Sequence, residues 1–314
     1  MVDIKRRRRG GEQPVVPEPE FTSYYGRPVL NAPVWRSPDI PGYLFLGGLA
    51  GASSLLGAGA QLTGRQRMAT VAKTGALGAV TLSLGALVRD LGRPARFLNM
   101  LRVFKPSSPM NIGSWLLSAY GPLAGAAAAS AVTGKLPKAG AAATAGAALV
   151  GPAVASYTAA LLSDTAVPAW HEGYRELPYV FVGSGAAAAG GLGLLAAPAG
   201  ESGPARNLAA LGTALELVAF TRMERRLGMV AEPYRSGTPG LLVRAGEVLS
   251  LAGLAGASLG RLSPVLNGLS GAALIASSAL TKWGVFAAGK ASAADPKYTI
   301  LPQRQRLQAR AGEQ

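Results

Sequence analysis

Four charged side chains interrupt stretches that are otherwise apolar, and their type and position suggest chemistry. Glu216 and Glu247 are acids, and Arg244 and Lys282 are bases, each inside a run of apolar and small residues. A charge at such a position is costly unless it has a partner or water. Two roles fit these residues: a structural ion pair, or a path for protons. We favour the ion pair because either base is available to each acid.

The segments that hold these residues belong to a series of eight apolar stretches. The windows between Asp39 and Arg65 and between Lys138 and Asp164 each enclose 25 uncharged residues. About 20 residues suffice for a helix to cross the hydrocarbon core of a bilayer. The expected membrane spans cover residues 43–62, 69–88, 112–132, 139–162, 177–199, 205–220, 241–259 and 265–287.

Composition supports the same fold class, an all-α integral membrane protein with eight transmembrane helices. Only 15% of the 314 residues are charged, against roughly 25% in soluble domains. The mean hydropathy is +0.26. We divide the chain into a basic and polar N-terminal tail (1–40), a transmembrane domain (41–289) and a polar C-terminal tail (290–314).

Small residues spaced four apart indicate how such helices pack, since they let two backbones approach closely in lipid. Three pairs have this spacing: Gly47 and Gly51, Gly121 and Gly125, and Gly256 and Gly260.

The absence of cysteine excludes several kinds of site. With no Cys, this chain has no disulfide, no thiolate nucleophile and no ligands for an iron–sulfur cluster or a Cys-bound zinc. Its single histidine, His171, is too few for a haem held by two histidines. We therefore expect no haem, no iron–sulfur cluster and no metal in this chain.

The N-terminus carries a basic run that is not followed by an apolar core, so we expect no cleaved signal peptide. The run comprises Lys5 and Arg6–Arg9. It fits contact with anionic lipid or a role in topology better than nucleic acid binding, because no basic fold with interleaved aromatic residues accompanies it.

Positive charges are distributed unequally between the two ends of the expected spans. Eight spans put both termini on one side, where 22 of the 31 Lys and Arg residues fall, against seven on the other. Basic residues accumulate on the cytoplasmic side of membranes. The distribution predicts cytoplasmic termini.

Family resemblance enters at the loop between the second and third spans. The segment DLGRPARFLNMLRVFKPSSPMNIGSW (90–115) closely resembles the NrfD-like family, the membrane subunits of polysulfide-reductase-type complexes. The segment YYGRPVLNAPVWRSPDIPGYLFLGGLAGAS (24–53) looks like the first span of that family and the residues before it. SYTAALLSDTAVPAW (156–170) and DPKYTILPQRQR (295–306) are also similar.

The resemblance implies an architecture and a function. It implies eight helices in two four-helix bundles and a site for menaquinone or ubiquinone as an exchangeable substrate. It further implies a ferredoxin-like iron–sulfur subunit and a molybdopterin-containing catalytic subunit as partners, in a prokaryotic cell membrane. The chain would then be a membrane subunit of an oxidoreductase, without a redox cofactor of its own.

Quinone chemistry requires an apolar slot, hydrogen bonds to two carbonyl oxygens and a route for protons. Tyr157 and Asp164 form our preferred pair, as hydrogen-bond donor and proton acceptor. They lie about 10 Å apart along one helix, at 1.5 Å per residue. The other quinone-binding candidates on the same side are Tyr43, Asp39, His171, Trp35 and Trp170. Membrane-interface anchoring and helix capping are alternative roles for several of these residues.

Basic residues in the central loop are candidates for docking a partner protein: Arg93, Arg96, Arg102 and Lys105. Two other functions compete with the redox function. A secondary transporter or channel would use the buried Glu, Arg and Lys residues as a substrate path, although no inverted repeat is evident. A structural anchor would keep the docking loop without a quinone slot.

Overall fold

The computed structural model describes residues 29–93, 95–260 and 263–312, and this part of the chain contains helices and loops without a strand. The all-α prediction is therefore confirmed for the described residues. The basic run Lys5–Arg9 of the predicted N-terminal tail lies outside them.

Eight long helices account for the eight apolar stretches of the sequence. They are α1 (Asp39–Leu62), α2 (Gln66–Asp90), α4 (Pro109–Thr133), α5 (Pro137–Ser163), α7 (Leu177–Ala196), α8 (Gly203–Leu227), α10 (Gly237–Leu259) and α11 (Pro264–Ala294). Seven of these helices are long and apolar enough to cross a membrane; α8 is not among them. Helix α8 is 25 residues long, but it ends in a cluster of charged residues that lowers its mean hydropathy.

Helix ends follow from local sequence, which explains why most helices extend beyond the apolar windows. Ser108 and Ser263 each precede a proline and accept a hydrogen bond from a backbone N–H of the first turn, at 3.5 Å in α4 and 3.4 Å in α11. Such caps satisfy amide groups that have no partner within the helix. Gly134 ends α4 in a left-handed conformation with φ of 70°.

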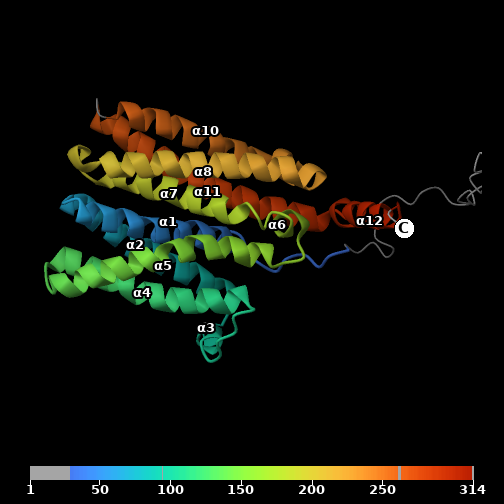
Figure 1. Cartoon of the computed structure of the whole chain (residues 1–314), viewed down its shortest axis with the longest axis horizontal. Coiled ribbons are helices and arrows are strands. Elements are labelled where there is room, and N and C mark those ends of the chain that lie inside the picture. The colour runs from blue at the N-terminus through green and yellow to red at the C-terminus, as the bar shows by residue number, and fades with distance from the viewer. Residues whose placement is uncertain (1–28, 94, 261–262, 313–314) are drawn as a thin grey trace, which may run out of the picture.

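Shorter helices lie between the long ones or, in the case of α12, after the last of them. They are α3 (Ala95–Met100), α6 (Pro168–His171), η1 (Ala199–Glu201), η2 (Gly228–Ala231), α9 (Glu232–Arg235) and α12 (Lys297–Gly312). Helices α6 and α12 lie at the end where α1 begins (Figure 1). The loop with α3 projects away from the packed helices below α4 (Figure 1).

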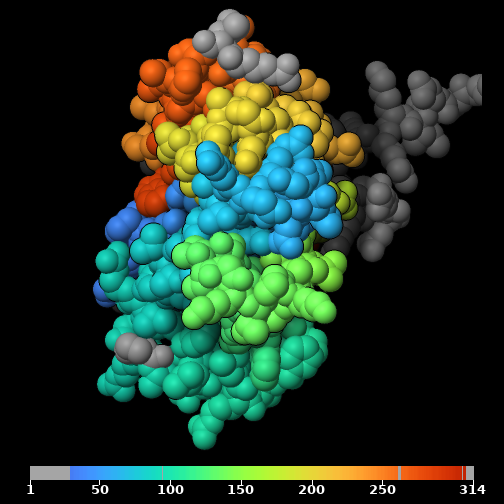
Figure 2. Space-filling model, turned by 90° about the vertical axis from the view of Figure 1, so that its left-hand side faces the viewer, coloured from blue at the N-terminus to red at the C-terminus, as the bar shows by residue number. Residues whose placement is uncertain are grey.

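The long helices pack antiparallel to their sequence neighbours, and α1 is central. Helices α1, α2, α4 and α5 contact one another in sequence order and close through α1 and α5. Helices α7, α8, α10 and α11 also contact one another in sequence order, and a contact between α7 and α11 completes this second group. Helix α1 also contacts α7 and α11, so it joins the two groups. The end-on view shows the blue-to-green helices below the yellow-to-orange ones (Figure 2).

Glycine contacts allow α1 to approach its neighbours backbone to backbone. A Cβ on Gly51 would overlap the carbonyl oxygen of Gly151 in α5, and a Cβ on Gly185 in α7 would lie 2.7 Å from the carbonyl oxygen of Gly48. Gly256 and Gly260 likewise face α11. A Cβ on Gly260 would lie 2.6 Å from Asn267 Oδ1. Gly121 has nothing within 4 Å. Two of the three predicted glycine pairs therefore contribute to close packing.

We expect Gly51→Ala to destabilise the protein by about 1–3 kcal/mol, because the new methyl group forces α1 and α5 apart. Gly121→Ala is the matched control: it makes the same chemical change within a long helix but meets open space. Thermal unfolding in mild detergent checks the prediction. Equal melting temperatures for the two variants would contradict it.

Candidate functional site

The segment before α1 is fixed to the end of α2 by two adjacent residues. The Arg89 guanidinium pairs with the buried Asp39 carboxylate, with 2.6 Å from Nε to Oδ1. The next residue, Asp90, accepts a hydrogen bond from the backbone N–H of Arg36 at 3.1 Å. Asp39 is thus already committed to an ion pair. This ion pair joins the start of α1 to the end of α2, and Asp90 holds the backbone of the segment that carries Trp35.

Helix α6 is fixed as firmly on the opposite wall of the site. The backbone N–H of Ala169 donates to Ser292 Oγ at 3.2 Å, and Trp170 Nε1 donates to the carbonyl oxygen of Val285 at 2.8 Å. The hydroxyl of Tyr234 donates to the carbonyl oxygen of Ala169 at 2.9 Å. Burial raises the pKa of Tyr234, so this hydroxyl keeps its proton as a hydrogen-bond donor at neutral pH.

These two anchored segments bring Trp35 and Trp170 together. Their ring centroids are 5.6 Å apart at an interplanar angle of 30°, and the Phe286 ring also stacks on Trp170, with centroids 5.7 Å apart. Trp170 is fully buried, whereas Trp35 is half-buried. The stack forms a flat aromatic wall.

A pocket of about 470 Å³ opens against this wall. Small-molecule sites in proteins measure roughly 300–1,000 Å³ and are mostly apolar. The lining comes from the segment before α1, the loop between α5 and α6, and α6 itself: Val29, Leu30, Asn31, Pro33, Val34, Trp35, Thr165, Ala166, Val167 and Trp170. The pocket can therefore hold a flat apolar ring system.

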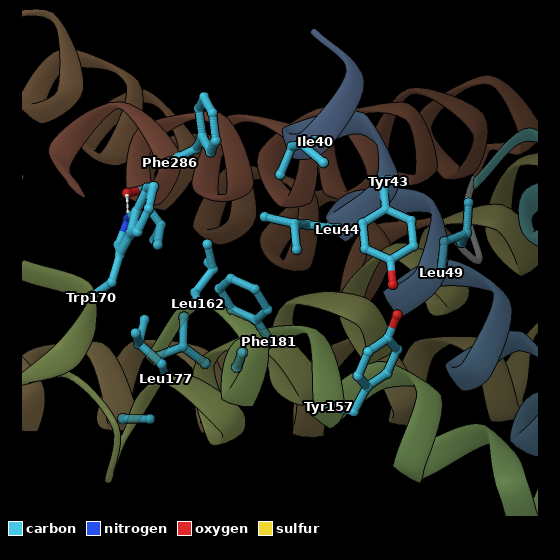
Figure 3. Packing of buried hydrophobic residues seen from close by; sticks show 14 of the residues in the cluster. Ile40, Tyr43, Leu44, Leu49, Tyr157, Leu162, Trp170, Leu177, Phe181 and Phe286 are labelled. Atoms are coloured by element: carbon cyan, nitrogen blue, oxygen red, sulfur yellow. Dashed lines mark hydrogen bonds between the residues drawn. The ribbon is translucent and has the colours of Figure 1, made fainter. Parts of the chain in front are cut away.

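Tyr43 and Tyr157 form a second aromatic pair further inside the helices. Both are buried, and their rings meet edge to face with centroids 6.5 Å apart. Their hydroxyl groups point toward one another from α1 and α5, while Trp170 lies at the other end of the cluster (Figure 3). The ring of Tyr157 fills the space left by the missing side chain of Gly113.

Tyr157 and Asp164 lie in different surroundings. Asp164 is exposed beyond the end of α5, whereas Tyr157 faces Tyr43 inside the protein. His171 is exposed as well, and its Nδ1 lies 3.0 Å from the carbonyl oxygen of Ser163. Asp164 adjoins the pocket residue Thr165, and His171 adjoins Trp170, so both lie beside the pocket in sequence.

Glu216 and Lys282 lie in a separate buried cluster between α7, α8 and α11. Glu216 Oε1 accepts a hydrogen bond from Thr281 Oγ1 at 2.7 Å. Lys282 Nζ donates to the carbonyl oxygen of Phe181 at 3.3 Å and lies 3.7 Å from the centre of the Phe181 ring. The two charges interact electrostatically, yet the described residues include no direct ion pair between them.

Three buried oxygens of this cluster have no hydrogen-bond partner among the described residues: Glu216 Oε2, Thr213 Oγ1 and Ser277 Oγ. Buried polar groups are normally hydrogen-bonded to protein or to water. Thr213 precedes Glu216 by one helical turn, and Ser277 precedes Thr281 by one turn. Two of the unpaired oxygens therefore come from α8 and one from α11.

The other two charges of the predicted group lie elsewhere. Arg244 is exposed and donates to the carbonyl oxygen of Arg235 at 3.1 Å. Glu247 is half-buried, and its side chain forms no ion pair within the described part of the chain. The four residues thus do not assemble into one structural ion-pair network.

The predicted docking residues are all exposed on the loop that carries α3: Arg93, Arg96, Arg102 and Lys105. Asn111, in the first turn of α4, shapes this loop. Its amide nitrogen donates to the carbonyl oxygens of Met100 at 2.5 Å and Val103 at 2.9 Å, and its Oδ1 accepts from the backbone N–H of Lys105 at 2.7 Å.

Sequence reasoning missed the residues that shape the site from a distance. Asn111, Arg89 and Tyr234 had no distinguishing local pattern, since each acts on a segment that is remote in sequence or in an irregular loop. The segment 29–34 carried one usable signal, because it is mostly apolar and directly precedes Trp35.

Fold and site together define a multi-pass helical membrane protein with an aromatic-walled pocket at one end of its spans. The sequence matches the family described as Polysulphide reductase, NrfD, over residues 30–222. The chain belongs to the NrfD family, and the predicted membership is confirmed. No curated protein matches it.

Proposed function

We propose that this protein is the quinone-binding membrane subunit of an oxidoreductase complex, exchanging electrons between membrane quinone and an iron–sulfur subunit. All eight long helices cross the membrane as two four-helix bundles, with α8 packed along α7. The charged end of α8 then lies at the membrane surface, and its only buried acid in the apolar part is Glu216.

The pocket that opens against the Trp35–Trp170 stack carries the proposal. Its volume suits a quinone ring, its walls are aromatic, and it opens at the end of the membrane-spanning helices from which an isoprenoid tail can enter the bilayer. Oxidation of a quinol there releases two electrons and two protons; reduction of a quinone takes them up. Tyr43 and Tyr157 lie deeper and suit hydrogen bonding to a quinone that moves further inward. The quinone is menaquinone or ubiquinone, as a substrate.

We expect Trp35→Leu to raise the KM for quinol about 3- to 10-fold, because the variant loses the aromatic stacking face but keeps an apolar side chain. Trp35 is the better target because Trp170 is fully buried and hydrogen-bonded. Trp115→Leu is the control, since Trp115 packs on Phe104 away from the pocket. Steady-state quinol oxidation by the purified complex checks this; an unchanged KM would count against the site.

The loop with α3 is the proposed docking surface for the iron–sulfur subunit, with a molybdopterin-containing subunit beyond it. Its four basic side chains are exposed at the same end of the helices as the pocket. Electron transfer over a short distance requires the quinone pocket and the docking surface for the iron–sulfur subunit to lie at the same end of the helices. The excess of basic residues there argues for a cytoplasmic face of a prokaryotic inner membrane.

Charge reversal tests the docking surface. We expect Arg93→Glu with Arg96→Glu to weaken association with the iron–sulfur subunit at least about 100-fold, because like charges then face each other across the interface. Arg67→Glu with Lys135→Glu makes the same change at the opposite end of the helices. Co-purification with the tagged subunit measures the effect. Loss of the partner in the control alone, or in neither variant, would refute this docking surface.

A proton path through Glu216 is a second part of the proposal, now favoured over a structural ion pair. The observation that favours it is the presence of three buried oxygens without a hydrogen-bond partner, on Thr213, Glu216 and Ser277. Water between them would connect the carboxyl group to neighbouring polar side chains. A transporter or channel would use the same cluster, but would leave the aromatic pocket and the docking loop unexplained.

In proteoliposomes, we expect Glu216→Gln to assemble normally and to reduce quinol-driven proton movement at least about 10-fold, since an amide cannot relay a proton as a carboxyl group does. Glu224→Gln is the control: Glu224 lies on the same helix but pairs with Arg235 near the surface. A pH-sensitive dye inside the vesicles reports the movement. Failed assembly of Glu216→Gln, with proton movement per complex unchanged, would instead support a structural role.

A further inference from the structure

A wide groove between the start of α7 and the end of α8 lies apart from the quinone pocket. It measures about 1130 Å³ and has a basic rim above an apolar wall. The rim consists of Arg175, Arg222, Arg225 and Arg226, with Glu176 as the single acid. The wall includes Tyr179, Leu215 and Val218, whose exposed fractions are 59%, 37% and 67%.

The one acid of the rim is already neutralised. Arg226 binds both carboxylate oxygens of Glu176, with 2.8 Å from Nε to Oε1 and 2.5 Å from Nη2 to Oε2. Arg175 donates to the hydroxyl of Tyr174 at 2.9 Å. Arg222 and Arg225 are exposed, and their side chains make no hydrogen bond or ion pair within the described part of the chain. The rim therefore presents uncompensated positive charge to an anionic ligand.

The depth of the groove identifies the ligand class. Helix α7 begins at Leu177 and is long and apolar enough to cross a membrane, so Arg175 and Glu176 mark the membrane surface. Leu215 precedes Arg222 by seven residues, which places the apolar wall about 10 Å further into the bilayer along α8. A soluble protein cannot reach that wall, whereas an acyl chain lies there naturally.

We propose that this groove is a binding site for an anionic phospholipid. Its phosphate contacts Arg222 and Arg225, and one acyl chain lies along Tyr179, Leu215 and Val218. Basic pockets between transmembrane helices recognise acidic headgroups in this way. The site needs the end of α8 to lie beside α7 at the membrane surface, but it does not depend on quinone turnover.

Native mass spectrometry of the complex purified in mild detergent tests the site, with phosphatidylglycerol and phosphatidylcholine as probes. We expect the wild-type complex to retain phosphatidylglycerol and not phosphatidylcholine. Arg222→Gln with Arg225→Gln should lower phosphatidylglycerol affinity by about 30-fold, the contribution of two basic residues at an anionic surface. Arg67→Gln with Lys135→Gln, which removes two charges at the other end, should leave the affinity unchanged.

Val218→Trp tests the acyl part without touching the charges. The indole should fill the groove and lower phosphatidylglycerol affinity by about 10-fold, because the displaced acyl chain loses its contact surface. Leu211→Trp is the matched control on the same helix, exposed but outside this groove. This variant keeps the test decisive should the double arginine variant not fold.

Three results would overturn the proposal: equal retention of the two lipids, unchanged affinity in both groove variants, or release of a protein subunit by the arginine variant with lipid binding intact. The last would make the rim a protein-docking surface. Quinone content measured in the same samples separates the two sites, because loss of lipid with normal quinone affects only the lipid groove.

Discussion

Backbone contact between glycines is the constraint on which the arrangement depends. In a bilayer, helices gain little from hiding apolar side chains from one another, so close van der Waals contact must hold them together. Helix α1 meets α5 through Gly51 and Gly151 and meets α7 through Gly48 and Gly185. These two contacts let one helix serve both groups of four. They bring α1 into backbone contact with a helix of each group.

The bilayer also determines where polar side chains can lie in this protein. Polar chemistry at the ends of the helices can use exposed side chains, and the pocket, the α3 loop and the arginine rim all lie at one end. Polar chemistry inside must be enclosed by protein. Glu216 and Lys282 accordingly lie among α7, α8 and α11, where hydroxyl groups and the ring of Phe181 surround them.

The sequence predicted the helices well because the property that defines them is local. Long intervals without charge mark them, although α11 continues to Ala294, beyond Lys282 and the predicted end at 287. The site was harder to predict because its geometry is not local. Spacing along one helix suggested pairing Tyr157 with Asp164, yet the nearest functional group to Tyr157 comes from α1. Small-residue spacing alone cannot distinguish Gly51, which touches another backbone, from Gly121, which touches nothing.

The aromatic stack links the pocket to the order in which the chain is made. Trp35 precedes the first helix, Trp170 follows the fourth long helix, α5, and Phe286 lies in the last long helix, α11. The three aromatic residues of one stack are therefore synthesised at widely separated times. The nascent first half can insert into the membrane, but it has no finished pocket. The stack beside the pocket is thus complete only once the last long helix has been made.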